Sequence, residues 1–172
     1  FLQAVRDEGV TVKTGALVSS LARKNGGLEV SLNNGDTFTV DMAAVATGVQ
    51  PNIRCLQNSG ITVNKGVVVN EYLATNVADI YAAGDVAEAQ DFLSADRSIY
   101  AIWPTAIDQG RVAGANMAGA NQAYPGSLGM NVVELFNVTL AQLGRFREGP
   151  DDDVQMLSTG RDGLYRKVVV DK

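Results

Sequence analysis

The sequence predicts a mixed α/β fold, and three observations support this prediction. Short unbroken apolar runs at 42–46, 67–69 and 80–83 have the composition of buried strands. The segment from Trp103 to Gly119 has the length and the end signals of a helix. Segments typical of antiparallel strands, separated by turn residues, lie before and after these elements. We therefore expect an α/β core joined to smaller α+β parts.

The composition is that of a soluble globular protein. Of the 172 residues, 46% are hydrophobic and 19% are charged, which argues against a disordered chain. The net charge of −5 offers no basic surface to a nucleic acid, so we expect no partner of that kind. No apolar run reaches the roughly 20 residues of a membrane span, so we expect no membrane association.

The cysteine and histidine content limits the chemistry. A single cysteine, Cys55, cannot form an internal disulfide, which indicates a reducing compartment and leads us to expect a cytoplasmic protein. Without histidine the chain has no Ser-His-Asp or Cys-His catalytic group, and we expect no transition-metal site. We interpret Cys55 as a small buried residue with a structural role. The alternative is a reactive thiol beside Arg54.

The first 40 residues predict the end of a helix followed by antiparallel strands. The pattern of Phe1–Glu8 is amphipathic and ends at Gly9. The strand signals that follow occupy four short segments: 10–13, 16–23, 28–32 and 37–40. Turns that begin at Asn25 and Asn33 separate the last three segments, because Asn and Gly tolerate a positive φ.

Two of the apolar runs end in small or polar residues. Met42–Ala46 suits a strand that is covered on both faces, and it leads into Thr47-Gly48. Ile80–Ala83 suits another buried strand, and it leads into Gly84-Asp85.

The remaining elements are shorter. Residues 51–58 predict a loop with a short helix, and Tyr124–Ser127 predicts a linker. Three further strands are expected near the C-terminus, at 132–136, 154–158 and 164–170. Asp162-Gly163 predicts a hairpin turn between the last two.

Gly84 and Asp85 form the first candidate site. Open α/β sheets bind ligands at the carboxyl ends of their strands, where these residues are expected. Glycine lets a ligand approach the backbone, and a carboxylate accepts hydrogen bonds from sugar-like hydroxyls, each contributing about 1.5–3 kcal/mol. The alternative is a turn in which Asp85 caps a helix.

The start of the helix predicted from Trp103 is the second candidate. A helix N-terminus exposes unpaired N–H groups and about half a positive charge, so it attracts an anion. Pro104 presets the first turn, and the expected donors are the backbone N–H groups of Thr105 and Ala106. Trp103 taken alone is typical of a core or interface aromatic residue. The small residues of this helix are also expected to pack on a sheet: Gly110, Ala113, Gly114 and Ala118.

Three segments carry a resemblance to a known family. Thr75–Asp85 resembles the second FAD-binding motif of the FAD-dependent pyridine nucleotide–disulphide oxidoreductases. Ala46–Asn52 resembles the crossover of the same family from its NAD domain to its FAD domain, and 124–131 resembles the entry to its dimerisation domain. The chain is most similar to the branch of NADH oxidases, rubredoxin reductases and nitrite reductase-like enzymes.

The resemblance implies roles for the candidate residues. Asp85, preceded by Gly84, would hold the ribityl chain of FAD, and the helix start would face the N1 and O2 edge of the flavin. No catalytic residue is implied within the chain. The other cofactor-binding residues implied are Trp103, Pro104, Thr105, Ala106, Thr47 and Gly48.

The resemblance also implies three domains. Residues 1–50 would be the C-terminal part of an NAD(P)-binding domain, 51–119 the second segment of an FAD-binding domain, and 120–172 the truncated start of a dimerisation domain. The sequence contains no Gly-x-Gly-x-x-Gly loop and starts at Phe1 within a helical pattern. We therefore expect the C-terminal part of a longer enzyme, inactive in isolation.

The implied function is transfer of a hydride from NAD(P)H to FAD and of electrons on to an acceptor. That acceptor would be oxygen, peroxide, a disulphide or a small redox protein, and the intact enzyme would be a homodimer. One alternative is a ferredoxin- or rubredoxin-type reductase that passes electrons to an iron–sulphur partner. Another is a module that serves only for dimerisation.

Overall fold

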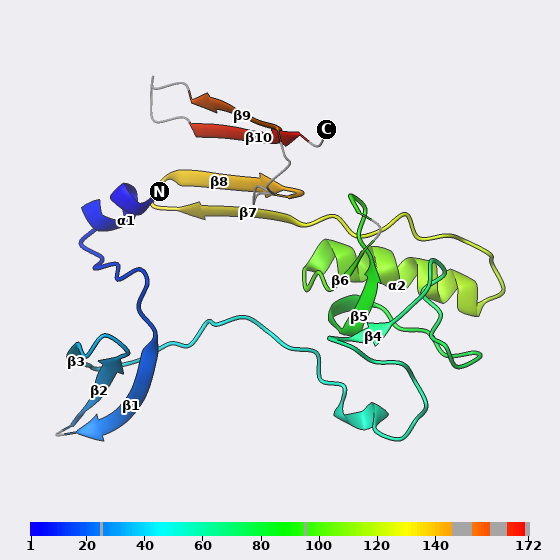
Figure 1. The fold of residues 1–172 in the computed structure, drawn as a ribbon, viewed down its shortest axis with the longest axis horizontal. Coiled ribbons are helices and arrows are strands. Elements are labelled where there is room, and N and C mark those ends of the chain that lie inside the picture. The colour runs from blue at the N-terminus through cyan, green and yellow to red at the C-terminus, as the bar shows by residue number, and fades with distance from the viewer. Residues whose placement is uncertain (25, 95, 146–152, 159–164, 171–172) are drawn as a thin grey trace. The chain divides into compact units, whose positions relative to one another are not determined.

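The computed structural model describes residues 1–24, 26–94, 96–145, 153–158 and 165–170. The chain divides into two compact units, whose elements are labelled in Figure 1. The first unit contains Phe1–Gly48 and Glu134–Thr139, and the second contains Val49–Val133 and Leu140–Lys172.

A short helix and an antiparallel sheet make up most of the first unit. The helix α1 (Leu2–Asp7) stops just before Gly9, whose N–H donates to the carbonyl of Arg6 at 2.9 Å. The sheet has the order β1-β2-β3, with strands at Val18–Lys24, Gly27–Leu32 and Thr37–Val40. These findings confirm the predicted helix end and three of the four predicted strands.

The turn between β2 and β3 uses the properties of Asn34 and Gly35. Gly35 has a φ of 90°, and the Asn34 side chain accepts the N–H of Asp36 at 3.1 Å. Lys13 forms an ion pair with Asp36 at 2.7 Å. This predicted turn is confirmed, whereas Asn25 of the preceding turn lies outside the described residues.

Two strands predicted for this unit are absent. Residues 10–13 and 42–46 belong to no strand, and the second run is exposed, with Met42 at 80% and Val45 at 75%. Apolar composition does not make a strand without neighbouring backbone to pair with. Within the described ranges no strand pairs with 42–46, so the prediction of a doubly covered strand is wrong.

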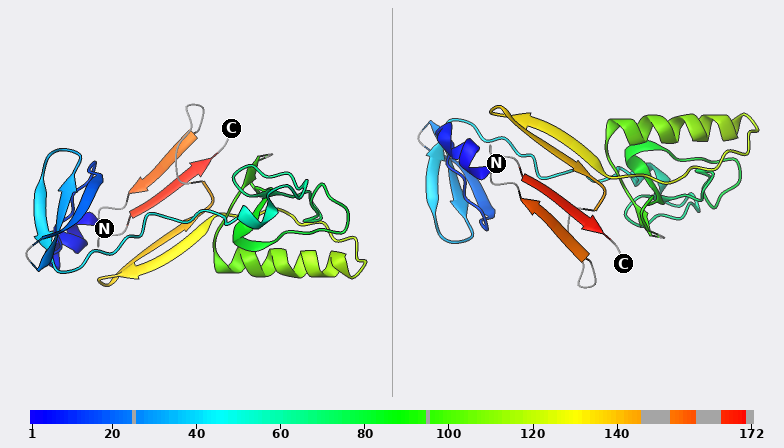
Figure 2. Two further views of the ribbon diagram at one scale, coloured as in Figure 1. Left: turned by 90° about the horizontal axis from the view of Figure 1, so that it is seen from below. Right: turned by 90° about the horizontal axis from the view of Figure 1, so that it is seen from above.

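A small mixed sheet and one long helix form the core of the second unit. β4 (Val67–Val68) pairs in parallel with β5 (Ala87–Gln90), and β5 pairs antiparallel with β6 (Arg97–Ser98). The helix α2 (Trp103–Met117) lies along this sheet in both Figure 1 and Figure 2. The buried core comprises Val67, Val69, Leu73, Ala87, Ala89, Val112, Ala113 and Tyr124.

Among the elements predicted between residues 51 and 119, three are confirmed and one is wrong. The buried strand at β4, the helix α2 and a short helix η1 (Arg54–Leu56) are present. Residues 80–83 form no strand: Tyr81 makes an isolated bridge to Ala74, and the N–H of Thr75 donates to the carbonyl of Ile80 at 2.8 Å. The apolar run therefore closes a tight loop.

The strand β5 was not predicted, because it contains a glutamate. Ala87, Glu88 and Ala89 are all buried, and Glu88 is 5% exposed. Burial of a carboxylate is favourable only when hydrogen bonds compensate for lost water, and nearby backbone N–H groups supply them here. The segment of β5 contains no unbroken apolar run, which is the signal that predicts a buried strand from a sequence.

Two hairpins follow in the C-terminal part of the chain. β7 (Met130–Leu135) pairs with β8 (Val138–Leu143), and β9 (Asp153–Ser158) pairs antiparallel with β10 (Tyr165–Val170). The strands β7, β9 and β10 were predicted. β8 was missed, because its turn places Phe136 and Asn137 at positive φ, where phenylalanine is uncommon. The predicted turn at Asp162-Gly163 lies outside the described residues.

The prediction that Tyr124–Ser127 is a linker is wrong. Tyr124 is 7% exposed and Ser127 is 1% exposed. The N–H of Ser127 donates to the carbonyl of Gln90 at 2.8 Å, and its carbonyl accepts the N–H of Phe92 at 2.9 Å. The segment is thus attached to the end of β5 as part of the folded second unit.

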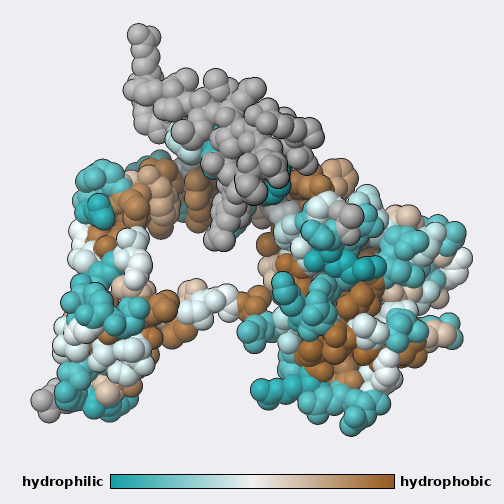
Figure 3. Space-filling view, viewed as in Figure 1, coloured by the Kyte–Doolittle hydropathy of each residue, from teal (hydrophilic) through white to brown (hydrophobic). Residues whose placement is uncertain are grey.

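The surface carries apolar side chains beside the polar ones (Figure 3). In the second unit, Phe92 and Trp103 are 56% and 80% exposed. No helix among the described residues has the length and apolar character needed to cross a membrane. In the same part of the chain no three potential metal-ligating side chains form a group.

Candidate functional site

Gly84 and Asp85 lie in a single 3-10 turn, η2 (Gly84–Val86), which follows extended backbone at Ala83. Gly84 has a φ of 81°, a conformation that side-chain-bearing residues adopt at a cost. A Cβ added at Gly84 would lie 3.5 Å from the Cβ of Ala106, an ordinary contact. The backbone conformation, rather than lack of space, therefore calls for glycine here.

The Asp85 carboxylate is exposed. The residue at the N-cap of η2 is Ala83, and no side chain caps this turn. The interpretation of Asp85 as a helix cap is therefore wrong. An exposed carboxylate without a structural partner in the turn can accept hydrogen bonds from a ligand.

A chain of hydrogen bonds, buried at Gln109 and Ser127, holds the Gly84 turn against α2. The N–H of Gly84 donates to Oε1 of Gln109 at 2.7 Å, and Nε2 of Gln109 donates to Oγ of Ser127 at 3.1 Å. This oxygen lies 3.0 Å from the hydroxyl oxygen of Tyr124. No role was predicted for Gln109, because a glutamine inside a helix gives no signal in the sequence that its amide is buried.

The first turn of α2 leaves two backbone donors unpaired. Ile102 is the N-cap and supplies no capping side chain, and Pro104 has no N–H. The N–H of Ala106 donates to the carbonyl of Ile102 at 3.1 Å, so the prediction that it is an available donor is wrong. Within the described residues, the N–H groups of Trp103 and Thr105 have no backbone partner.

The faces of α2 differ from the expected arrangement. The buried face consists of Thr105, Gln109, Val112, Ala113 and Asn116. Gly110 and Gly114 face open space, since a Cβ added at either would meet no atom within 4 Å. The prediction that these two glycines pack on the sheet is wrong, whereas Ala113 does belong to the core.

The other predicted site residues occupy different positions. Trp103 is 80% exposed at the helix start, and Thr105, two residues further on, is buried. Thr47 and Gly48 are exposed and belong to the first unit, whereas the other six belong to the second. Cys55 is exposed, so its interpretation as a buried residue is wrong.

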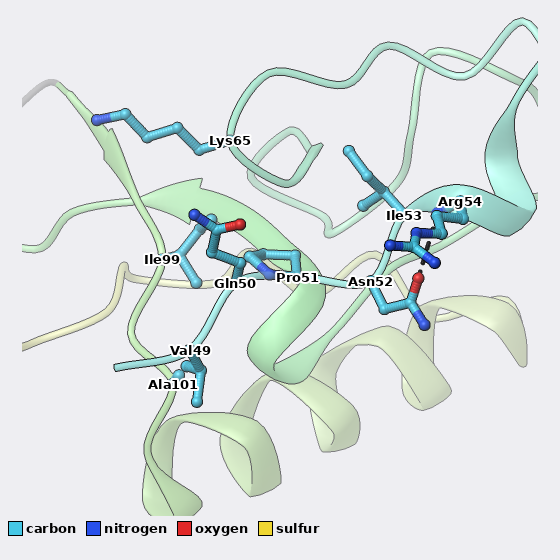
Figure 4. A pocket seen from close by; sticks show the side chains of 9 residues that line it. All are labelled: Val49, Gln50, Pro51, Asn52, Ile53, Arg54, Lys65, Ile99 and Ala101. Carbon is cyan, nitrogen blue, oxygen red and sulfur yellow. Dashed lines mark hydrogen bonds between the residues drawn. The ribbon is translucent and has the colours of Figure 1, made fainter. Parts of the chain in front are cut away.

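A cleft of about 910 Å³ lies beside the predicted residues rather than over them. Figure 4 shows Arg54 on one side of it and Lys65 on the other. Neither side chain forms an ion pair within the described part of the chain, so the cleft has a cation on each side. The full lining is Val49, Gln50, Pro51, Asn52, Ile53, Arg54, Lys65, Ile99 and Ala101.

A tyrosine and a carboxylate meet just before α2. The hydroxyl of Tyr100 donates to Oδ2 of Asp91, and Oδ1 of Asp91 accepts the N–H of Leu93 at 2.7 Å. Burial and this contact with a carboxylate together raise the pKa of Tyr100 to about 12. Tyr100 is therefore a neutral phenol at physiological pH and closes the loop that precedes the helix.

These groups suit two parts of a flavin cofactor, its hydroxyl-bearing chain and the pyrimidine edge of its ring. An exposed carboxylate after a glycine turn suits a chain of hydroxyls. Two unpaired N–H groups at the positive end of a 15-residue helix suit a ring edge that gains negative charge. Both groups are held together, because the N–H of Gly84 donates to Gln109 of the same helix.

The architecture belongs to the class of two-dinucleotide-domain flavoprotein oxidoreductases. The family model described as pyridine nucleotide-disulphide oxidoreductase matches residues 1–110, and the chain belongs to this family. The family and the fold class predicted from the sequence are thereby confirmed.

Individual proteins extend the similarity over more of the chain. The NADH-dependent phenylglyoxylate dehydrogenase subunit epsilon of Aromatoleum evansii is 32% identical over 97% of this chain and 40% of its own length. The NADH oxidase of Methanocaldococcus jannaschii is 33% identical over 68% of this chain and 26% of its own length. The chain thus spans less than half of each of these relatives.

A solved structure agrees with the fold. The FAD-dependent pyridine nucleotide-disulphide oxidoreductase from Desulfovibrio vulgaris aligns with a TM-score of 0.77 and 27% identity. The alignment covers 91% of this chain and 41% of that protein.

Proposed function

We propose that this chain supplies the flavin-facing part of an enzyme that transfers a hydride from NAD(P)H to FAD and passes electrons to an acceptor. One observation carries the proposal. The glycine turn that presents Asp85 is bonded to the helix whose unpaired N–H groups lie at Trp103 and Thr105. Two bonded elements thus present a carboxylate for hydroxyls, on η2, and a positive helix end for a ring edge, on α2.

In this proposal the residues of the chain bind FAD and orient its ring. The Asp85 carboxylate accepts hydrogen bonds from the ribityl hydroxyls, and Gly84 lets the chain of hydroxyls come close to the backbone. The N–H groups of Trp103 and Thr105 face the pyrimidine edge, with Pro104 and Ala106 shaping the first turn. FAD, when bound, supplies the redox chemistry.

The positive end of α2 is expected to shift the reduction potential of a bound flavin in one direction. The N-terminal end of α2 favours the more negative state of the group beside it, by roughly 1–2 kcal/mol for a partly buried dipole. For a two-electron couple this corresponds to a potential raised by about 20–45 mV. The helix end therefore favours acceptance of the hydride.

The division into domains follows from the same assignment. Residues 1–50 form the end of the NAD(P)-binding domain and 51–119 the second segment of the FAD-binding domain, with Thr47 and Gly48 at the crossover. The boundary of the two compact units, between Gly48 and Val49, supports this crossover. Residues 120–172 begin the dimerisation domain, so the intact enzyme is a homodimer.

The acceptor is a small molecule or a small redox protein. The net charge of −5 and the single cysteine support a cytoplasmic enzyme that binds neither nucleic acid nor membrane.

A second candidate function is that of an electron-transfer subunit of a larger complex, which serves an iron–sulphur partner. This candidate is favoured by the relative that matches 97% of this chain, because its name describes it as a subunit of an NADH-dependent dehydrogenase.

An absorbance scan tests the proposal. The natural gene product that contains these 172 residues is expected to be yellow after purification, or to become so on incubation with FAD. A colourless protein that stays colourless with FAD contradicts the flavin assignment. Reduction of the bound flavin by NADH or NADPH then identifies the donor.

A further inference from the structure

The chain of hydrogen bonds through Gln109 has a fixed direction. The backbone N–H of Gly84 can only donate, so Gln109 must present its oxygen to Gly84 and its nitrogen to Ser127. A flipped amide would place two donors face to face. Gln109 and Ser127 are each 1% exposed, so burial keeps the bond between them away from bulk water.

This arrangement acts on Gly84, the residue that immediately precedes Asp85. Glycine has a wide range of backbone conformations, so Gly84 by itself leaves the direction of the next residue open. The 2.7 Å bond to Gln109 removes that freedom. Because Gln109 belongs to the helix that starts at Trp103, the bond also joins the carboxylate to the helix end.

The same amide reaches a segment far along the chain. Ser127 lies 18 residues after Gln109, and its backbone pairs with Gln90 and Phe92 at the end of β5. The Tyr124 hydroxyl meets the Ser127 hydroxyl at 3.0 Å. The segment 124–127 therefore helps to hold the Gln109 amide in its orientation, through the Ser127 hydroxyl.

We propose that Gln109 is a positioning residue for the flavin site, held in its working orientation by Ser127 and Tyr124. Attachment of the segment 124–127 thereby sets how tightly the Gly84–Asp85 turn binds the hydroxyl-bearing chain of the cofactor. This inference rests on the proposed function. It assigns to the segment that follows α2 a role in cofactor affinity.

The first test replaces the amide by an apolar chain of similar length. Gln109→Met leaves the Gly84 N–H without its acceptor. In the natural gene product, the dissociation constant for FAD, from fluorescence titration, is expected to rise roughly tenfold. Hydrogen exchange of the peptide that contains Gly84 is expected to become faster in the FAD-free protein.

A matched control uses the other buried amide of α2. Asn116 donates to the carbonyls of Tyr72 and Gln122, each at 2.9 Å, and touches none of the proposed flavin-binding groups. Asn116→Ala is expected to lower the melting temperature while the FAD dissociation constant stays within about twofold of wild type.

A double mutant separates positioning from general stability. Tyr124→Phe removes only a hydroxyl and is expected to weaken FAD binding about two- to threefold, by loosening the Gln109 amide. Added to Gln109→Met, it is expected to weaken binding no further, because it acts through that amide.

The outcomes distinguish a failure of the proposed flavin-binding function from a failure of the inference on Gln109. Wild-type protein that binds no FAD refutes the proposed function, and the inference with it. Wild type that binds FAD, with Gln109→Met lowering only the melting temperature as Asn116→Ala does, overturns the inference alone. If Gln109→Met does not fold, Tyr124→Phe decides, and an unchanged dissociation constant is then the contrary result.

Discussion

The carboxylate of Glu88 accepts a hydrogen bond from the backbone N–H of Gly66, 3.0 Å away and 22 residues earlier in the chain. The same oxygen accepts the N–H of Lys65 at 2.9 Å, and the other accepts Nδ2 of Asn64 at 2.9 Å. A buried glutamate of β5 thus shapes the loop that leads into β4. Lys65 of this loop lines the cleft shown in Figure 4.

This arrangement predicts a pH-dependent stability. Burial raises the pKa of Glu88, but the hydrogen bonds from Gly66, Asn64 and Lys65 outweigh it, and the pKa is lowered from 4.5. A lowered folded-state pKa stabilises the protein above the unfolded value, and this contribution disappears as the pH falls through the folded value. The stabilisation by Glu88 is therefore complete near neutral pH and lost in acid.

Glu88→Gln is expected to reduce stability by about 2 kcal/mol at pH 7, because the amide nitrogen faces N–H donors. Urea denaturation at a series of pH values measures this difference, which should shrink as the pH falls below 4.5 and through the lowered pKa of folded Glu88. Glu29→Gln, which breaks an exposed pair with Lys24, serves as control and should cost less than about 1 kcal/mol. A pH-independent loss at Glu88 would contradict the assignment.

Tyr100 provides a spectroscopic prediction. Its phenol is expected to ionise near pH 12 rather than pH 10, so the ultraviolet titration of wild type minus Tyr100→Phe should show one late tyrosine. The raised folded-state pKa means that the stability contributed by this group is present below pH 10 and falls as the pH rises towards 12. Asp91→Asn should move the titration towards 10, and an unchanged midpoint would show that burial alone causes the shift.

The elements predicted correctly are those determined by local signals. The helix α2 combines a proline in its first turn with a glycine after its end, and β3 follows an Asn-Gly turn. These signals act over a few residues, so a sequence reveals them. The glycine turn at Gly84 is of the same kind, since a positive φ selects glycine directly.

The elements missed or misplaced depend on distant partners. Glu88 is buried only because the loop at Gly66 brings it donors, and Gln109 is buried only because Gly84 and Ser127 meet its amide. Conversely, the apolar run at 42–46 has the composition of a strand but no pairing partner among the described residues. Periodicity and composition contain no information on such long-range pairing.

Gly84→Ala tests whether the glycine is selected by its backbone. An alanine Cβ would only touch Ala106 at 3.5 Å, so the expected loss of about 1–2 kcal/mol comes from the left-handed conformation. Thermal unfolding compares it with Gly114→Ala, in an exposed helical position with open space, where about 0.5–1 kcal/mol of stabilisation is expected. If Gly84→Ala stabilised the protein as Gly114→Ala is expected to do, the claim that the left-handed backbone of residue 84 requires glycine would be refuted.

Asp85→Ala tests the proposed cofactor contact itself. The carboxylate is exposed and caps no helix, so its removal is expected to change the melting temperature of the FAD-free protein very little. Loss of a charge-assisted hydrogen bond of about 1.5–3 kcal/mol should weaken FAD binding roughly ten- to a hundredfold. Melting curves with and without FAD, together with fluorescence titration, measure both quantities.

Two further variants make this last test selective. Asp85→Asn retains an acceptor oxygen without the charge, so its FAD affinity should lie between those of wild type and Asp85→Ala. Asp41→Ala removes another exposed carboxylate, in the first unit, and should leave FAD affinity unchanged. If Asp41→Ala weakened FAD binding as much as Asp85→Ala, net charge would explain the effect and the ribityl contact would be refuted. If Asp85→Ala lowered the melting temperature equally with and without FAD, while affinity stayed constant, Asp85 would have a purely structural role.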